Sequence, residues 1–138
     1  MATVTRYNHT LKLVGDKSID YANLKVMLLN NHTFDATHTA ISSISGDEVS
    51  GNGWTAGGEP IANAAWAIVN TNDGRLDGDD ISVTASGGSI GPADGHVVYD
   101  ATNNLPLLYV AYASDQEAGD GTAFKVTFAS NGIIQMTV

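Results

Sequence analysis

Short apolar stretches separated by turn-forming residues run through most of this sequence, and they constrain its fold more than any other feature. In residues 123–129, AFKVTFA, apolar side chains alternate with polar ones, which is the period of a half-buried β-strand. Residues 132–138, GIIQMTV, show the same period, with Ile134, Met136 and Val138 expected to face inward. The turn SNG between them favours a tight hairpin, so we predict that these two strands pair with each other.

Further stretches bounded by Gly, Asn, Asp or Pro are also predicted strands. They span residues 10–14, 24–29, 64–69, 80–85, 95–100 and 106–113. Strands at this spacing predict an all-β fold, an antiparallel β-sandwich or a jelly-roll-like barrel with long glycine-rich loops. A helix is expected only around residues 18–25. The length of 138 residues suits a single β-sandwich domain over residues 24–138, preceded by an N-terminal segment, residues 1–23, that could act as an arm.

The stretch PLLYVAYA, residues 106–113, departs from simple alternation because both of its faces are apolar. Leu107 and Tyr109 are expected to point to one face. The other face carries Leu108, Val110 and Tyr112. Two interpretations stay open: a central strand covered by two layers of the same chain, or a strand with one face covered by another subunit.

The net charge of −9 is unevenly distributed along the chain. Four basic and two acidic residues give residues 1–25 a net charge of +2, which leaves −11 for the rest. An acidic body repels phosphate backbones and anionic lipid, so we expect neither nucleic acid nor membrane as a partner. The N-terminus has no signal-peptide pattern, and no run of about 18 apolar residues is present, so we expect a soluble protein without a cleaved signal.

The sequence shows no motif that places catalytic or metal-binding groups together. No nucleophile motif sets a serine beside a base, and the four histidines lack the spacing that aims two ligands at one metal. Two acidic stretches, residues 70–80 and 116–124, have oxygen ligands that calcium accepts, but Asp and Gly in this pattern are also ordinary turn residues. We therefore predict no catalytic, cofactor or metal site, and a protein that is not an enzyme.

The segment EVSGNGWTAGGEP, residues 48–60, places four glycines around Trp54. A phosphate-binding loop needs a lysine after its glycines, and this segment has none, so nucleotide binding is disfavoured. Glycines permit positive φ angles, and the large indole either folds back over its own sheet or inserts into a neighbour. Folding back is the favoured interpretation.

The order of several segments resembles small structural proteins of tailed bacteriophages. The segments are LKVMLL, HTFDATHT, EVSGNGWTAGG, DDISVTASGGSIGPADGHVVYD, PLLYVAYA and FKVTFASNGIIQMTV, which together span residues 24–138. The most specific are TFDA, the Glu-Val-x-Gly-x-Gly-aromatic-Thr-x-Gly-Gly loop, and the Asp-Asp pair before a strand. The first 23 residues lie outside this likeness.

The resemblance implies a non-enzymatic virion component, most plausibly a cement or decoration protein on the outer surface of the capsid, made in the host cytoplasm. Its partners would be the major capsid protein or other virion proteins, and we expect a homo-oligomer, a dimer or trimer. The candidate interface residues are Arg6, Tyr7, Trp54, Leu108, Val110 and Tyr112. Two alternatives stay open: a tail, head-tail junction or fibre-associated component, and a carbohydrate or cell-surface binding module with Trp54, Tyr109 and Tyr112 stacking on sugar rings.

Overall fold

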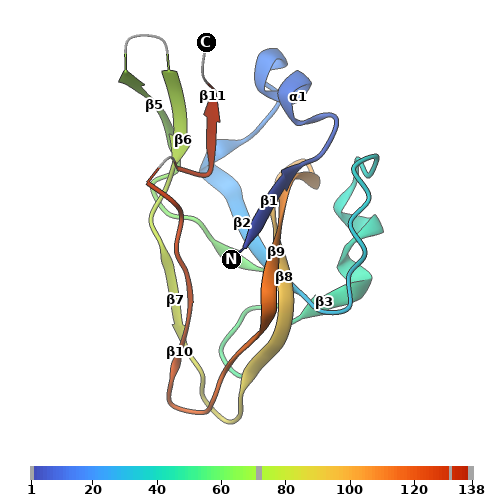
Figure 1. Ribbon diagram of the computed structural model, residues 1–138, viewed down its shortest axis with the longest axis vertical. Helices are drawn as coiled ribbons and strands as arrows, with labels where there is room; N and C mark the ends of the chain where they lie inside the picture. Colours follow the sequence, from blue (N-terminus) through green and yellow to red (C-terminus); the bar gives the residue numbers. More distant parts are fainter. Residues whose placement is uncertain (1, 71–72, 131, 137–138) are drawn as a thin grey trace.

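The computed structural model describes residues 2–70, 73–130 and 132–136, and its strands form two antiparallel layers (Figure 1). The larger layer has the strand order β1-β9-β8-β2-β3, with β4 also paired to β2. Its strands are β1 (Thr3–Arg6), β2 (Leu24–Leu29), β3 (Glu48–Val49), β4 (Glu59–Pro60), β8 (Ile90–Asp100) and β9 (Leu105–Ala118). The predicted all-β sandwich is thus confirmed, and the sheets do not close into a barrel over the described residues.

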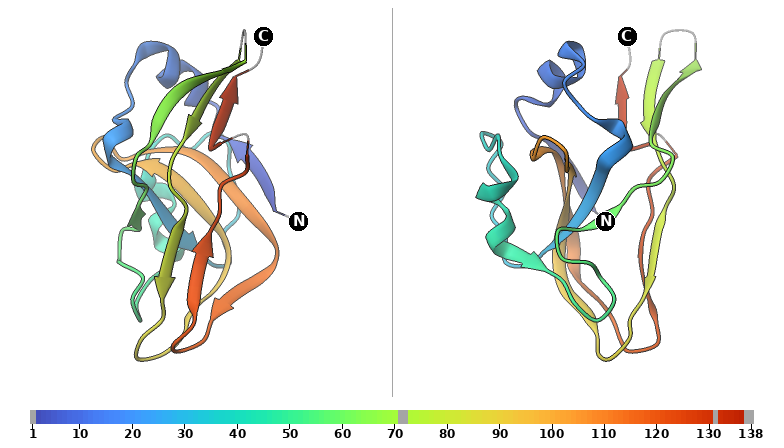
Figure 2. Two further views of the ribbon diagram at one scale, coloured as in Figure 1. Left: turned by 90° about the vertical axis from the view of Figure 1, so that its left-hand side faces the viewer. Right: turned by 180° about the vertical axis from the view of Figure 1, so that it is seen from behind.

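The second layer consists of two small sheets that follow one another along the long axis of the molecule (Figure 2). One pairs β7 (Ile81–Thr84) with β10 (Ala123–Val126). The other has the order β11-β6-β5, with strands β5 (Ala65–Asn70), β6 (Asp73–Asp77) and β11 (Ile134–Met136). The chain runs from β6 into β7 and returns from β10 into β11, so both sheets belong to one interrupted ribbon.

Apolar side chains are buried on both faces of the larger layer. The cluster between the two layers includes Leu24, Val26, Leu28, Trp54, Leu76, Val98, Leu107, Leu108 and Phe124. The opposite face is covered by the segment between β2 and β3, which contains two short 3₁₀ turns, η2 (Ile41–Ser43) and η3 (Ser45–Asp47). The cluster there includes Tyr7, Met27, Leu29, Ile41, Ile44, Val97, Tyr99 and Tyr109.

The central position of β9 explains why both of its faces are apolar. It lies between β1 and β8, and its two sides contribute to the two separate clusters. The expected alternation is wrong at one residue, because Leu107 packs in the same cluster as Leu108. Leu108 pairs with Val98 and Pro106 with Tyr99, so Leu107 is the extra residue of a β-bulge.

The predicted terminal hairpin is wrong, although both of its strands exist. β10 pairs with β7 and β11 pairs with β6, so the two strands belong to different sheets and are not partners. Phe124 and Val126 face the core and Lys125 is exposed, as their alternation predicts. Ile134 is buried, but Met136 is 42% exposed, because β11 ends beyond the body of the core. Val138 lies outside the described residues.

The helix lies at a different place from the one predicted. Residues 10–14, predicted as a strand, form the start of α1 (Thr10–Asp16), which ends where Lys17 adopts a left-handed conformation. Alternating apolar residues over so short a stretch fit either structure, and the buried Thr10 hydroxyl, which donates to the Leu107 carbonyl at 2.5 Å, favours the helix. Residues 18–25 contain only a 3₁₀ turn, η1 (Tyr21–Asn23), before β2 begins.

The N-terminal segment, residues 1–23, packs on the domain's own larger sheet over its described residues. β1 pairs antiparallel with β9, and Tyr7 is buried on the face covered by the β2–β3 segment. His9 Nε2–H donates to the Pro106 carbonyl at 2.6 Å, and the buried Asp100 carboxylate accepts from the Asp20 N–H at 2.9 Å. These contacts fix the segment along its length, and an arm that also reaches a neighbour stays a prediction.

Candidate protein-binding groove

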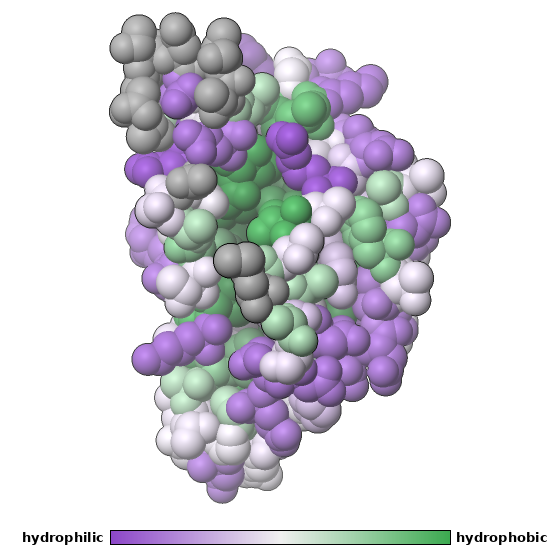
Figure 3. Space-filling view, in the orientation of Figure 1, coloured by the Kyte–Doolittle hydropathy of each residue, from purple (hydrophilic) through white to green (hydrophobic). Residues whose placement is uncertain are grey.

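A groove opens between the two layers on the side where β1 ends the larger sheet (Figure 3). It consists of two cavities of about 310 and 230 Å³, which share His96, Val110 and Thr127 among their lining residues. One wall is β1 with Val4, and the other is formed by residues 123–129 together with Gly132 and Ile133. Because the shared residues make the cavities neighbours, the groove follows β9 for much of its length.

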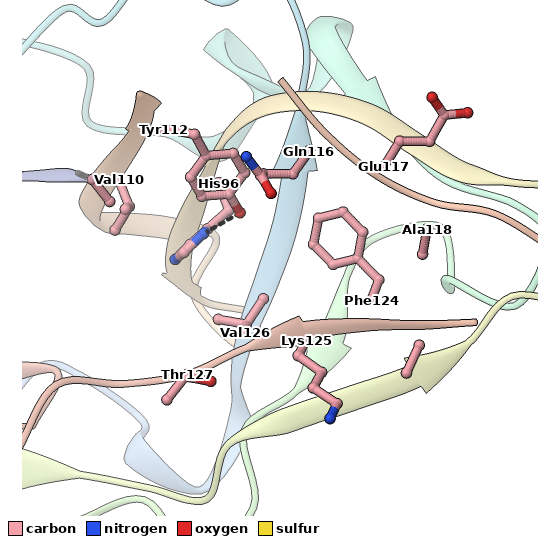
Figure 4. Close-up of a pocket in the computed structure, with 12 residues that line it drawn as sticks. His96, Val110, Tyr112, Gln116, Glu117, Ala118, Phe124, Lys125, Val126 and Thr127 are labelled. Atoms are coloured by element: carbon pink, nitrogen blue, oxygen red, sulfur yellow. Dashed lines mark hydrogen bonds between the residues drawn. The ribbon is translucent and has the colours of Figure 1, made fainter. Parts of the chain in front are cut away.

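The floor of the groove is mainly apolar. Leu108 and Val110 come from β9, and Phe124 and Val126 project toward them from β10. Figure 4 shows that the Lys125 side chain points away from this floor. A volume of this size and polarity suits a few apolar side chains of an extended segment.

One polar pair, His96 and Tyr112, lies in the apolar floor (Figure 4). Nδ1 of His96 and the Tyr112 hydroxyl are hydrogen-bonded at 2.6 Å, and the two rings are tilted with centroids 5.5 Å apart. Burial lowers the pKa of His96 to about 4, so the imidazole is neutral near pH 7. Burial also raises the pKa of the Tyr112 hydroxyl, which therefore stays protonated. The hydrogen bond pairs Nδ1 of His96 with the Tyr112 hydroxyl, and at neutral pH the two side chains carry no charge into the groove.

Three of the six candidate interface residues line this groove: Leu108, Val110 and Tyr112. Arg6 is exposed on β1, opposite Leu108 in the register. Tyr7 belongs to the cluster on the other face of the sheet, and Trp54 lies deep between the layers. The structure thus brings four of the six to one side of the molecule, and their role as an interface stays a prediction.

The glycine-rich segment folds back over its own sheet, as favoured from the sequence. Trp54 is only 1% exposed and packs edge-on against Phe124, with ring centroids 5.5 Å apart. Gly51 and Trp54 exchange backbone hydrogen bonds around Asn52 and Gly53, which both have positive φ, as in a type I′ turn. A side chain at Gly53 would approach the Thr84 carbonyl to 2.9 Å, so close packing as well as the turn requires glycine there.

Two residues of the groove escaped prediction from the sequence. The spacing of His96 from the other histidines indicates no site, and its contact with Tyr112 depends on the pairing of β8 with β9. Val4 lies in a segment assigned to an arm, although the β-branched residues of TVTR, residues 3–6, are themselves a strand signal. Local sequence could have identified β1, whereas the His96 contact needs the tertiary fold.

The acidic stretches are parts of strands and turns. In residues 70–80, Asp73 and Asp77 are the ends of β6, and Asp80 Oδ1 accepts from the Phe128 N–H at 2.9 Å. In residues 116–124, Asp120 Oδ1 accepts from the Gly87 N–H at 3.1 Å. Over the described ranges, no group of three His, Asp or Glu side chains is arranged to hold a metal ion. The same part of the chain contains no helix long and apolar enough to cross a membrane.

Comparisons with models of protein families, with curated proteins and with solved structures find no match to this chain. An apolar floor, a neutral polar pair and a bordering strand edge can bind a protein segment by shape and backbone pairing.

Proposed function

We propose that this chain is a non-enzymatic structural protein of a tailed-bacteriophage virion, a cement or decoration protein bound to the outer surface of the capsid. The sequence resemblance over residues 24–138 suggests the virion, and the groove beside β1 is the observation that suggests attachment to protein. Made in the host cytoplasm, the protein would join the shell at assembly. Its partners would be the major capsid protein or other virion proteins, and copies of itself in a dimer or trimer.

The groove supports binding to protein because it combines two kinds of complementarity. Its floor offers apolar surface from Leu108, Val110 and Phe124, which an apolar side chain of a partner can cover. Its wall β1 is the last strand of the sheet, so a strand of another copy of this chain can pair beside the apolar floor. Many copies on a shell gain from avidity even if each copy binds weakly.

The alternatives fit these residues less well. A carbohydrate module would need several exposed aromatic rings, yet Trp54 and Tyr109 are buried, and Tyr112 alone of the three lines the groove. An enzyme would need an activated nucleophile beside the neutral His96–Tyr112 pair. Of the residues that line the same cavity, only Thr127 has a hydroxyl of the Ser or Thr type, and Thr127 is exposed. A location in the tail or at the head-tail junction uses the same protein-binding surface and is distinguished by stoichiometry.

The test of this proposal is the copy number of the protein in purified virions, measured by quantitative mass spectrometry against the major shell protein. A ratio near one copy per shell subunit supports a cement or decoration protein. A handful of copies would move the protein to the tail or the junction. Absence from the particle would contradict a virion role altogether.

A matched pair of variants tests whether the groove is the attachment surface. Gln116→Trp adds a bulky side chain at the groove, where Gln116 is exposed and points toward Tyr112 (Figure 4). Gln135→Trp makes the same change on β11, at a residue that does not line the groove. Shells lacking the protein should take up Gln135→Trp like the wild type and take up less Gln116→Trp. Equal uptake of both variants would place attachment elsewhere.

A further inference from the structure

The outer edge of β1 carries backbone groups that no described strand pairs. β1 pairs with β9 on one side, with Val4 opposite Val110 and Arg6 opposite Leu108. Beyond its end, the Tyr7 N–H donates to the Leu107 carbonyl at 3.2 Å. Because hydrogen bonds of an antiparallel pair alternate along a strand, Thr5 and Thr3 also bond toward β9. The N–H and C=O of Val4 and Arg6 therefore point to the open side.

This edge lacks the features by which proteins usually protect an edge strand. All four residues of β1 are exposed, and three of them are β-branched. Val4 is 58% exposed although it is apolar, and Arg6 is the one charge. At the opposite edge of the same sheet, β3 and β4 are only two residues long. Short strands and charges are common protections, so of the two edges of this sheet β1 is the better suited to add a strand.

The surroundings leave room for an added strand. β1 lies at the margin of the molecule in the left view of Figure 2, with its outer edge toward solvent. Val4 borders the groove, so a strand added outside β1 would extend the sheet over the groove's mouth. Its side chains on that face would then cover Val4.

We propose that a second copy of this chain is the occupant of this edge, with the two β1 strands paired antiparallel across a two-fold axis. The register that places Val4 opposite Val4 of the second copy aligns the free backbone groups of both strands. It also sets Thr3 opposite Thr5 and covers each exposed valine with the other, which are favourable cross-strand pairs. Arg6 then lies at the two ends of the pairing, away from its copy, so like charges do not meet.

The charge distribution favours this edge for self-association. Each chain has a net charge of −9, so two copies repel each other at most orientations. Residues 1–25, which contain β1, have a net charge of +2, whereas the remainder carries −11. β1 itself contains no acidic residue, so pairing the two β1 strands sets no carboxylate of one strand opposite a carboxylate of the other. The same strand pairing joins the two larger sheets into one continuous sheet, and this inference does not depend on the virion role.

Cysteine substitution tests the pairing directly, because the chain has no native cysteine. Directly opposite residues of antiparallel strands have Cα atoms about 4.5–5.5 Å apart, which lies within disulfide range. Purified Val4→Cys should form a disulfide-linked dimer under mild oxidation. Leu11→Cys, at an apolar residue of α1 with 48% exposure, and Thr5→Cys, which would face Thr3, are the controls and should cross-link several-fold more slowly. Equal rates for the three variants would overturn the proposed register.

Light scattering over a range of concentrations tests the dimer without cross-linking. The wild type should shift from monomer to dimer as concentration rises, because a four-residue pairing buries less than a standard interface of about 1,600 Å². Val4→Pro removes an outward N–H while leaving the bonds to β9, so it should stay monomeric at every concentration with an unchanged circular dichroism spectrum. A wild type that is monomeric up to its solubility limit would overturn the proposal, whatever its copy number in virions.

Discussion

The two faces of the larger sheet are buried in different ways. One face packs against a second layer of strands, and the other is covered by the segment between β2 and β3. The segment between β2 and β3 closes its face with aromatic contacts. Phe34 stacks on Tyr109 with ring centroids 5.5 Å apart, and the ring centroids of Tyr7 and Phe34 are 5.0 Å apart. The regular layer leaves a groove along one side.

The difference follows from how each cover can adapt. A segment with 3₁₀ turns can bend until its side chains fill the surface below it, because it has no ladder of hydrogen bonds to keep. A sheet keeps its strand spacing and twist, so two sheets that end on the same side leave the space between their edges open. The open side is also where β1 offers unpaired backbone groups. The surface available to a partner therefore lies on the face of the larger sheet that packs against the second layer of strands.

Replacing Trp54 with alanine is the strongest way to break the inter-layer face. Removal of a buried aromatic residue costs about 3–5 kcal/mol, so the free energy of unfolding in urea should fall by that amount. Trp54→Phe should cost much less, because the indole Nε1 has no hydrogen-bond partner among the described residues. Ile68→Ala is the control: Ile68 is 86% exposed, and its loss should change stability by less than about 0.5 kcal/mol. Equal losses for Trp54→Ala and Ile68→Ala would contradict the packing described.

The face covered by the β2–β3 segment is broken best at Ile44, which is fully buried there. Ile44→Ala should lower the free energy of unfolding by about 2–5 kcal/mol, whereas the neighbouring Ser43→Ala, at an exposed residue, should be near neutral. In the Ile44→Ala variant, hydrogen exchange should also become faster at the backbone N–H of residue 44. In the wild type this N–H donates to the Ile41 carbonyl at 2.9 Å. A small loss of stability would mean that the segment contributes little to the fold.

Acidification should weaken the groove side through His96. Burial lowers the pKa of His96 to about 4, below its ordinary value of 6.5, so between these pH values the unfolded chain binds the proton more readily. Stability from this residue is full above pH 6.5 and is lost as the pH falls toward 4, by up to about 3 kcal/mol. Unfolding free energies measured across this range should fall more steeply for the wild type than for His96→Gln. Parallel curves would show that His96 is already solvated in the folded protein.

The positions of the strands were easier to predict from the sequence than the pairing between them. Residues 24–29 form β2 as predicted, because an apolar run interrupted only by Lys25 and bounded by Asn at both ends is a local signal. The pairing of β10 with β7, and of β11 with β6, depends on contacts between residues 39 to 62 positions apart, which no local turn motif encodes. α1 was missed for a related reason, since the hydrogen bond from Thr10 to Leu107 holds it in place.

The candidate site was predictable only in part. Leu108, Val110 and Tyr112 could be selected from an apolar strand, because too many apolar residues on one strand indicate cover on both faces. Nothing local distinguishes Val110, which is accessible from the groove, from Trp54, which is enclosed. That distinction depends on where the second layer ends, and it is therefore a property of the tertiary fold.

Replacing valine with threonine at an exposed and at a buried position compares the groove side with the inter-layer face. The exposed position gives the smallest effect that we expect. Val4→Thr, at the mouth of the groove, should change the free energy of unfolding by less than about 0.5 kcal/mol, because water already reaches this side chain. Val98→Thr makes the same change on the inter-layer face, where Val98 is fully buried, and a hydroxyl without a partner there costs about 1–3 kcal/mol. Both variants should be unfolded in urea at a concentration low enough to keep the chain monomeric. If Val4→Thr cost as much as Val98→Thr, the groove would be closed in solution and the edge of β1 would not be free to pair.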